Sequence, residues 1–429
     1  MTYQHVSCIF ETAAKVCAVV LIFVIIISVF PAVLMFNLAI LLSLAAGNYR
    51  EKLRLIFSNP ITLPFVIFFC LFLFGTLYST ASVSDILIDL RKHSKFLLGL
   101  MFIPLFVEEK WRSYAISSFM AAAFAMLLCS YLTFFECFKG LLVDGGMVEV
   151  FKIAMEFNGI MSLMSYFCLM RIFNCFTRYR FLWIIFLVFL THTILFRSIG
   201  RTGFVVFFAL WMLFFYQKYK WKGCIVGIIS LSMLGILSII YPYTFSQRSR
   251  VAVKEIEEYV SLEDINSGGG VKANENIETY FHKIGSSGIR LHFVRNALIL
   301  IKAYPIFGSG TGSYSKEYSS LNLTLFERKL FPRPNPHNEY IYIGVQFGIL
   351  GLVVLILFFY MPLYYSKFLP EREKYIVRAV IVTVIIGSLA NNWLTVMVYR
   401  YMYVYFVPLA FAAFPIRKER QSLRKVFGC

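Results

Sequence analysis

The sequence predicts an all-α, polytopic integral membrane protein, and three observations support this fold class. Hydrophobic residues make up 59% of the 429 residues and charged residues only 15%, which is more apolar surface than a soluble core of this length can hide. The apolar residues gather in segments of about 20, the length that an α-helix needs to cross a bilayer core about 30 Å thick. Basic residues mark every second connection between these segments.

Twelve apolar segments are predicted to span the membrane. They cover residues 12–30, 31–47, 62–79, 90–107, 113–134, 153–173, 182–197, 202–216, 223–242, 338–365, 375–393 and 399–415. The first two form one run that only Pro31 interrupts, so we expect a tight hairpin there. The segment 202–216 is short and is expected to depend on buried or interfacial neighbours.

The connections predict the orientation of the chain. Lys and Arg cluster after the second, fourth, sixth, eighth and tenth segments, and again in the tail after the twelfth. Because short basic loops stay in the cytoplasm, these connections and both termini are predicted to be cytoplasmic. The net charge of +18 then reflects topology and attraction to anionic headgroups, so membrane lipids are expected partners. Nucleic acid is not expected, because no soluble region carries a basic patch with interleaved aromatic residues.

The segments divide the chain into three parts. Residues 1–242 are predicted as a membrane domain with nine helices, 243–336 as one large loop with amphipathic helices, and 337–429 as three more membrane helices and the basic tail. This topology puts the loop on the side of the membrane away from the termini, which long loops reach regardless of charge. The first half of the loop predicts a surface helix followed by a linker at 268–270.

The second half of the loop predicts an amphipathic helix. Four apolar residues recur at four-residue spacing: Ile289, Phe293, Ala297 and Ile301. Ser286 or Ser287 can cap this helix, and Pro305 ends it. Arg290 falls in its first turn, while Arg295 lies about 140° around the axis, so these two side chains cannot share one face.

Three glycines follow the helix, at positions 308, 310 and 312. Small residues there allow backbone N–H groups to approach either an anion or a packed neighbour closely. A glycine-rich turn alone does not choose between these two uses.

Charged residues near the outer ends of the helices are the candidates for chemistry. A charge at membrane depth costs roughly 2.5 to 3.5 kcal/mol on insertion scales. Arg197 and Arg201 stand at the outer end of the seventh segment, where they either snorkel to headgroups or bind substrate. Arg201, Arg290 and His337 are all predicted at this membrane face, and two guanidinium groups with an imidazole suit a phosphate-bearing substrate.

The stretch FPRPNPHNEY, residues 331–340, introduces the tenth segment. Its prolines favour a stiff approach, and His337 follows the last of them at the mouth of a helix. Asn338 and Glu339 stand beside His337 and can orient its ring. Arg333 in the same stretch is a possible substrate-side charge.

Three stretches resemble the O-antigen ligase and polymerase superfamily of bacterial envelope proteins: GRTG at 200–203, IRLHFVRNALILIKAYPIFGSGTGSY at 289–314, and PHNEYIYIGVQFGILGLVVL at 336–355. The resemblance implies a C-type glycosyltransferase-like architecture with one large periplasmic loop. It also implies a multi-pass protein of the bacterial inner (cytoplasmic) membrane with its active site on the periplasmic side.

The resemblance further implies glycosyl transfer in lipopolysaccharide biosynthesis. A polysaccharide would move from undecaprenyl diphosphate to a sugar hydroxyl of the lipid A core. The arginine that the family carries after its seventh helix falls on Arg201, its loop arginine on Arg290 and its histidine on His337. Ile341 and Tyr342 replace the usual leucine and glutamine of the family motif, at positions that need not carry the chemistry.

The chemistry of the implied reaction agrees with these residues. The negative charge that develops on the leaving diphosphate must be stabilised, and because the sequence has no D-x-D motif, Arg201 and Arg290 are predicted to do this without a metal or other cofactor. His337, with a reference pKa near 6.5, can take the proton of the acceptor hydroxyl, and direct displacement inverts the anomeric carbon. Glu339 either assists the histidine or caps the helix. Further possible substrate-binding residues are Arg197, Arg295, Asn338 and Arg333.

Three other functions stay open. An O-antigen polymerase would use the same lipid carrier, and transfer of glycan to a protein side chain would use the same site. The large single loop and the H-N-E-Y motif favour a ligase over a polymerase. The third is a lipid-linked glycan transporter. Broken helices in two corresponding halves are typical of transporters, and the sequence shows no such internal repeat.

Overall fold

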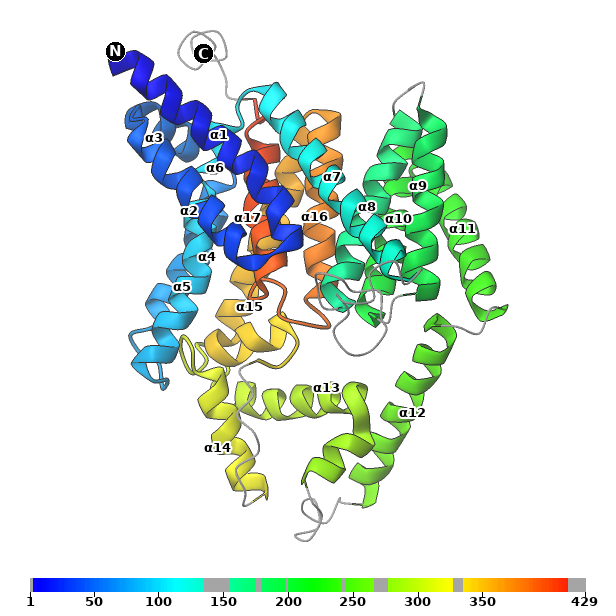
Figure 1. Cartoon of the computed structure of the whole chain (residues 1–429). Helices are drawn as coiled ribbons and strands as arrows, with labels where there is room; N and C mark the ends of the chain where they lie inside the picture. The colour runs from blue at the N-terminus through cyan, green and yellow to red at the C-terminus, as the bar shows by residue number, and fades with distance from the viewer. Residues whose placement is uncertain are drawn as a thin grey trace.

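The computed structural model describes residues 3–134, 154–174, 179–197, 200–240, 244–265, 277–326 and 335–415. These residues form helices and turns without a strand, so the all-α class is confirmed. Figure 1 shows a bundle of helices, with α12, α13 and α14 gathered at the end opposite the N-terminus.

The helices have the following bounds. The first part of the chain contains α1 (Tyr3–Ile27), α2 (Val29–Ala45), α3 (Tyr49–Phe57), α4 (Thr62–Gly75), α5 (Val83–Gly99), α6 (Phe102–Leu105), α7 (Glu109–Phe134), α8 (Ala154–Asn174), α9 (Arg180–His192), the π-helix η1 (Thr193–Arg197), α10 (Arg201–Tyr219) and α11 (Trp221–Ile240). The rest contains α12 (Thr244–Ile265), α13 (Ile277–Ala303), α14 (Tyr314–Phe326), α15 (Glu339–Tyr365), the 3-10 helix η2 (Ser366–Phe368), α16 (Glu371–Gly387) and α17 (Met397–Phe411).

Each of the twelve predicted apolar segments contains helix. Among the described residues, five helices are long and apolar enough to cross a membrane: Gln4–Ile27, Glu109–Leu132, Arg180–Arg197, Arg201–Tyr219 and Glu339–Phe368. The pair α3 and α4, bent by 90°, makes a sixth if it counts as one span. The total of twelve spans and the division of the chain at 242 and 336 stay predictions.

The first two helices form the hairpin expected near Pro31. The break lies at Ser28, whose backbone is extended with φ −146° and ψ 144°. Pro31 lies in the first turn of α2, where its missing N–H group leaves no intrahelical hydrogen bond unmade. The two helices then pack along each other.

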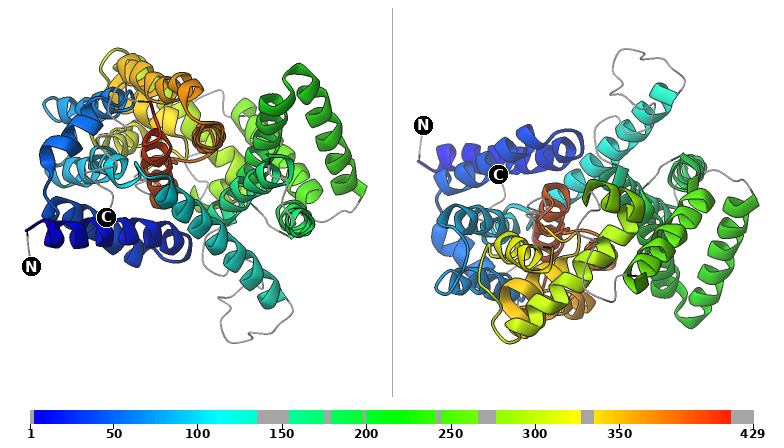
Figure 2. Two further views of the ribbon diagram at one scale, coloured as in Figure 1. Left: turned by 90° about the horizontal axis from the view of Figure 1, so that it is seen from above. Right: turned by 90° about the horizontal axis from the view of Figure 1, so that it is seen from below.

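Helix α17 lies in the centre of the bundle, where it packs against α1, α5, α6 and α16 (Figure 2). Its residues from Val398 to Phe411 are all buried. The hydroxyl groups of Tyr399, Tyr403 and Tyr405 donate hydrogen bonds to backbone carbonyls of α8, α15 and α1 respectively. These bonds satisfy polar groups that would otherwise be buried at a cost, so the aromatic residues here serve the core.

Helix α13 lies across the end of the bundle (Figure 2) and packs against α12, α14 and α15. The backbone of Gly285 is non-helical, with φ 57°, and the predicted amphipathic part follows it and runs to Ala303. Phe293 and Ala297 are buried in the main core, so the predicted apolar face is confirmed. The predicted linker at 268–270 lies outside the described residues.

The glycine-rich turn after α13 packs against protein backbone. All three glycines have positive φ values, from 67° to 92°. The N–H groups of Gly310 and Thr311 donate to the carbonyls of Gln346 and Gly75, and the N–H of Gly312 donates to the Gln346 side chain. Of the two uses open from sequence, the structure shows close packing against neighbours, which fixes α13 to α4 and α15.

Candidate functional site

Arg201 is the first residue of α10, directly after Gly200 at the N-cap position. Its Nη1 atom donates hydrogen bonds to Glu255 Oε2 of α12, at 3.1 Å, and to the Ser287 hydroxyl of α13. The backbone N–H of Ser287 donates to the same carboxylate oxygen at 2.9 Å. Arg201 therefore joins α10 to two helices of the large loop, α12 and α13.

Glu255 is held as a carboxylate by this network. Burial alone would raise the pKa of Glu255, but the hydrogen bonds from Arg201 and Ser287 outweigh burial and lower its pKa from the usual value. Its negative charge lies where two positive charges come together.

Arg290 is the second of these positive charges. It follows Ser287 by three residues on α13, which puts the two side chains on neighbouring positions of the helix surface. Burial, and then the positive charge of Arg201, lower the pKa of the Arg290 guanidinium, while Glu255 opposes the shift. The structure thus brings together the two arginines that were predicted to act as a pair.

His337 contacts the same stretch of α13. Its ring stacks on Phe293, with centroids 6.1 Å apart and planes at 28°. Phe293 follows Arg290 by three residues, so one face of α13 serves both the arginine pair and the histidine. His337 has φ 52°, a left-handed conformation that is uncommon outside glycine, and its N–H donates to Asn335 Oδ1 at 3.2 Å.

Asn391 is a partner of the His337 ring, with its Oδ1 atom 3.2 Å from His337 Nδ1. It lies in the turn between α16 and α17, and the same oxygen accepts the N–H of Asn392. Because an amide oxygen can only accept, the contact favours the tautomer with its proton on Nδ1 and leaves Nε2 as the basic nitrogen. Sequence reasoning missed this residue.

Asn338 and Glu339 have different roles at the start of α15. The Asn338 side chain caps the helix by accepting the N–H of Ile341 at 3.1 Å. Glu339 is fully buried, and its carboxylate accepts the N–H of Leu394 at 3.0 Å. The residue that caps the helix is therefore Asn338, whereas Glu339, for which capping was one of two predicted roles, contacts the turn that carries Asn391.

The remaining candidate arginines lie apart from this cluster. Arg197 donates to the carbonyl of Ser130 at 2.9 Å and stacks over Tyr131, so it contacts α7. Arg295 is exposed on α13, on a different side from the half-buried Arg290, as its spacing predicted. Arg333 lies outside the described residues.

No group of three His, Cys, Asp or Glu side chains that could hold a metal ion occurs in the part of the chain that the structure describes. The polar groups that converge on α13 are two guanidinium groups, one carboxylate and one imidazole.

The fold and this cluster define a helical membrane protein with a cationic site at one end of its bundle. Residues 184–356 match the family model described as O-antigen ligase, so this region of the chain is similar to the members of that family. The matched region includes Arg201, Arg290 and His337.

One curated relative is a protein of Haemophilus influenzae (strain ATCC 51907 / DSM 11121 / KW20 / Rd) named only as an uncharacterized protein. It is 27% identical to this chain over 157 residues, which cover 36% of this chain and 35% of the relative. The match thus spans about a third of the length of the relative, whose name indicates no activity.

Proposed function

We propose that the protein is an O-antigen ligase, a glycosyltransferase of lipopolysaccharide biosynthesis. It transfers a polysaccharide from undecaprenyl diphosphate to a sugar hydroxyl of the lipid A core. The reaction takes place at the periplasmic face of the bacterial inner membrane, needs no metal ion and inverts the anomeric carbon. The family match supports the coarser statement, an enzyme of ligase or polymerase type that uses a lipid-linked glycan donor and a lipid acceptor.

The observation that carries the proposal is the convergence of three distant residues on α13. Arg290 of α13 lies beside Arg201 of α10, and Phe293, one turn further along, supports the ring of His337. A diphosphate next to a base is the arrangement that the reaction requires, because the leaving group and the acceptor hydroxyl flank the anomeric carbon.

The reaction follows from the charges of these groups. The acceptor oxygen attacks the anomeric carbon, and the bond from that carbon to the diphosphate breaks with its electron pair on the diphosphate. Arg201 and Arg290 stabilise this charge, which is why we propose metal independence. The acceptor proton goes to Nε2 of His337, whose Nδ1 faces Asn391.

Glu255 has a place in this scheme. Its carboxylate now accepts a hydrogen bond from Arg201, at the point where a diphosphate oxygen would bind. Binding of the donor would therefore compete with Glu255 for Arg201. Arg290 would attract the diphosphate as well, and it has no ion pair among the described residues that this binding would break.

An O-antigen polymerase on the same lipid carrier is the alternative that is compatible with the family match. The two can be separated in cells that carry His337→Ala, with envelope glycolipids resolved by size and by carrier. Loss of a ligase leaves the lipid A core bare while long polymer accumulates on undecaprenyl diphosphate. Loss of a polymerase leaves single repeat units attached to the core.

The control for this experiment is His5→Ala, since His5 is exposed in the first turn of α1, far from α13. Both variants must reach the membrane at the level of the unmodified protein. Unchanged glycolipids in His337→Ala cells would contradict both activities.

A further inference from the structure

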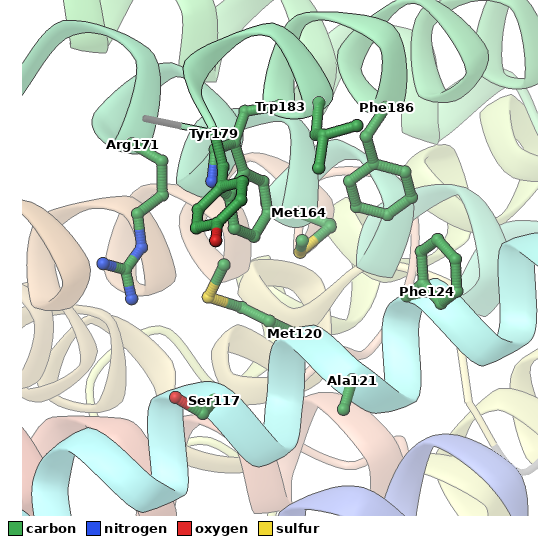
Figure 3. A pocket seen from close by; sticks show the side chains of 10 residues that line it. Ser117, Met120, Ala121, Phe124, Met164, Arg171, Tyr179, Trp183 and Phe186 are labelled. Atoms are coloured by element: carbon green, nitrogen blue, oxygen red, sulfur yellow. The ribbon is translucent and has the colours of Figure 1, made fainter. Parts of the chain in front are cut away.

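A cavity of about 500 Å³ lies between α7, α8 and α9 (Figure 3). Its volume falls in the range of about 300 to 1,000 Å³ that is usual for small-molecule sites. The cavity lies far from Arg201 and Arg290 along the bundle. Helix α8 ends and α9 begins at the cavity, whereas the other end of α9 continues through η1, which contacts α12. The basic connection between α8 and α9 is predicted to face the cytoplasm.

The lining of the cavity changes from polar to apolar along the helices. Figure 3 shows Arg171 and Tyr179 at one end, and Phe124 and Phe186 at the other. Tyr179 and Phe186 are seven residues apart, which is about 10 Å along a helix. The cavity therefore has the polarity of an amphiphile, with one charged end and one apolar end.

Arg171 has no hydrogen-bond or ion-pair partner among the residues that the structure describes. Three other cations of this half of the bundle are paired with carboxylates: Lys15 with Glu108, Lys52 with Glu11, and Arg112 with Glu373. Among the described residues, the half-buried guanidinium of Arg171 thus lacks a counter-charge of the kind that these three cations have.

We propose that this cavity binds one anionic phospholipid of the leaflet opposite the candidate active site. The phosphate accepts hydrogen bonds from Arg171, since a guanidinium matches phosphate oxygens in charge and geometry. Tyr179 and Trp183 lie at headgroup level, where amphipathic rings are favoured, and an acyl chain runs between Phe124 and Phe186. The site does not depend on the proposed transferase activity, because it lies at the other end of the helices.

The unmodified protein allows a direct test through the fluorescence of Trp183. The protein is reconstituted in two kinds of phosphatidylcholine vesicles. One kind contains phosphatidylglycerol with brominated acyl chains, and the other contains the same amount of bromine on the acyl chains of phosphatidylcholine. The Trp183 signal is the difference between the protein and its Trp183→Phe variant. We expect brominated phosphatidylglycerol to quench this signal at a several-fold lower mole fraction, and equal quenching by the two lipids would overturn the proposal.

Arg171→Gln then tests the contact, with Arg180→Gln as its matched control. Arg180 belongs to the same basic connection but does not line the cavity. We expect Arg171→Gln to lower the preference for phosphatidylglycerol roughly fivefold, the effect of one cation near a membrane surface, and Arg180→Gln to preserve it. Equal losses in both variants would mean diffuse surface attraction and would refute a specific site.

Ala121→Phe gives an independent variant that keeps every charge. Ala121 lines the cavity from α7 and is exposed to it, so a phenyl ring there occupies space that the acyl chain needs. We expect quenching of Trp183 by brominated phosphatidylglycerol to fall to the level given by brominated phosphatidylcholine. Full retention of the preference would show that the lipid binds elsewhere.

Discussion

At the scale of single residues, the contact between His337 and Asn391 sets the protonation of the candidate base. We predict that Asn391→Asp raises the pKa of His337, because a carboxylate at this distance stabilises the imidazolium form. A histidine acts as a general base only when it is neutral. The pH at which the rate of glycan transfer rises should therefore be about one unit higher than in the unmodified protein. The measurement is the initial rate of transfer between pH 5 and 9.

Asn391→Ala is the matched variant for this prediction. It removes the hydrogen bond without adding charge, so transfer should slow while the pH at which the rate rises moves much less. A purely structural role for Asn391 would lower the rate in both variants and leave the pH profile of Asn391→Asp where it was.

Which residues of the site could be predicted depended on their sequence context. Arg201, Arg290 and His337 stand next to glycine, serine or proline signals at helix ends, where a charge is conspicuous in an apolar chain. Asn391 has no such signal, because it contacts His337 across 54 residues from a turn whose shape comes from packing. Glu255 lies among several acidic residues of one charged stretch, and only the folded helices show which of them faces Arg201.

At the scale of elements, the contact between α12 and α13 depends on the charge of Glu255. The pKa of Glu255 in the folded protein lies below its usual value, so its contribution to stability is complete above the usual value and is lost as pH falls through the lower pKa of the folded protein. We predict that amide hydrogen exchange in α12, corrected for the intrinsic effect of pH, accelerates on acidification below about 4.5.

Glu255→Gln provides the comparison for this experiment. The amide keeps the shape of the side chain but cannot titrate, so exchange in α12 should already be faster at pH 6 and should change little below pH 4.5 in this variant. The same acid-induced increase in both proteins would assign it to other carboxylates.

The glycine-rich turn makes a second prediction about elements. Gly308 has φ 67°, and a Cβ atom there would lie 2.3 Å from the backbone of Gln346 and Phe347. Gly308→Ala should therefore destabilise the protein by about 1 to 3 kcal/mol, because neither the conformation nor the contact tolerates a side chain. Thermal unfolding in detergent measures the loss.

Gly235→Ala is the control, since Gly235 lies in α11 and no atom is within 4 Å of its Cβ position. This change should be neutral or stabilise the helix by about 0.5 to 1 kcal/mol. Equal destabilisation by the two substitutions would show that the turn does not hold α13 against α15.

Local sequence patterns predicted the helices better than their associations. Four-residue spacing identified the apolar face of α13, and the break near Pro31 separated α1 from α2. Gly348 of α15, with φ 59°, accommodates the turn after α13, since a Cβ atom there would meet the backbone of Pro305 and Ile306. The same kind of pattern could not predict this contact. Close approach between distant segments has no periodic signature in the chain.

At the scale of the whole molecule, the charge pattern and the fold suggest the same polarity. The helices of the large loop lie at one end of the bundle, and α1 begins at the other (Figure 1). The ion pairs of Lys15 with Glu108 and of Arg112 with Glu373 lie at the end of the bundle away from α13, where the positive-inside rule puts the basic connections. Apolar length alone could not settle the number of spans, because α17 is only 15 residues long and is buried within the bundle.

Cysteine labelling in intact cells tests this orientation. Lys302 of α13 and Lys110 of α7 are both exposed, and they represent the two ends of the bundle. We predict that a membrane-impermeant maleimide labels Lys302→Cys in cells with a permeabilised outer membrane, because α13 is proposed to face the periplasm. Lys110→Cys should react only after the inner membrane is opened, since its connection is basic and short. The opposite result is that Lys110→Cys reacts first and Lys302→Cys only after the inner membrane is opened, each above the labelling of the native cysteines. It would show that the protein has the opposite orientation, with Arg201, Arg290 and His337 on the side where a periplasmic ligase could not use them.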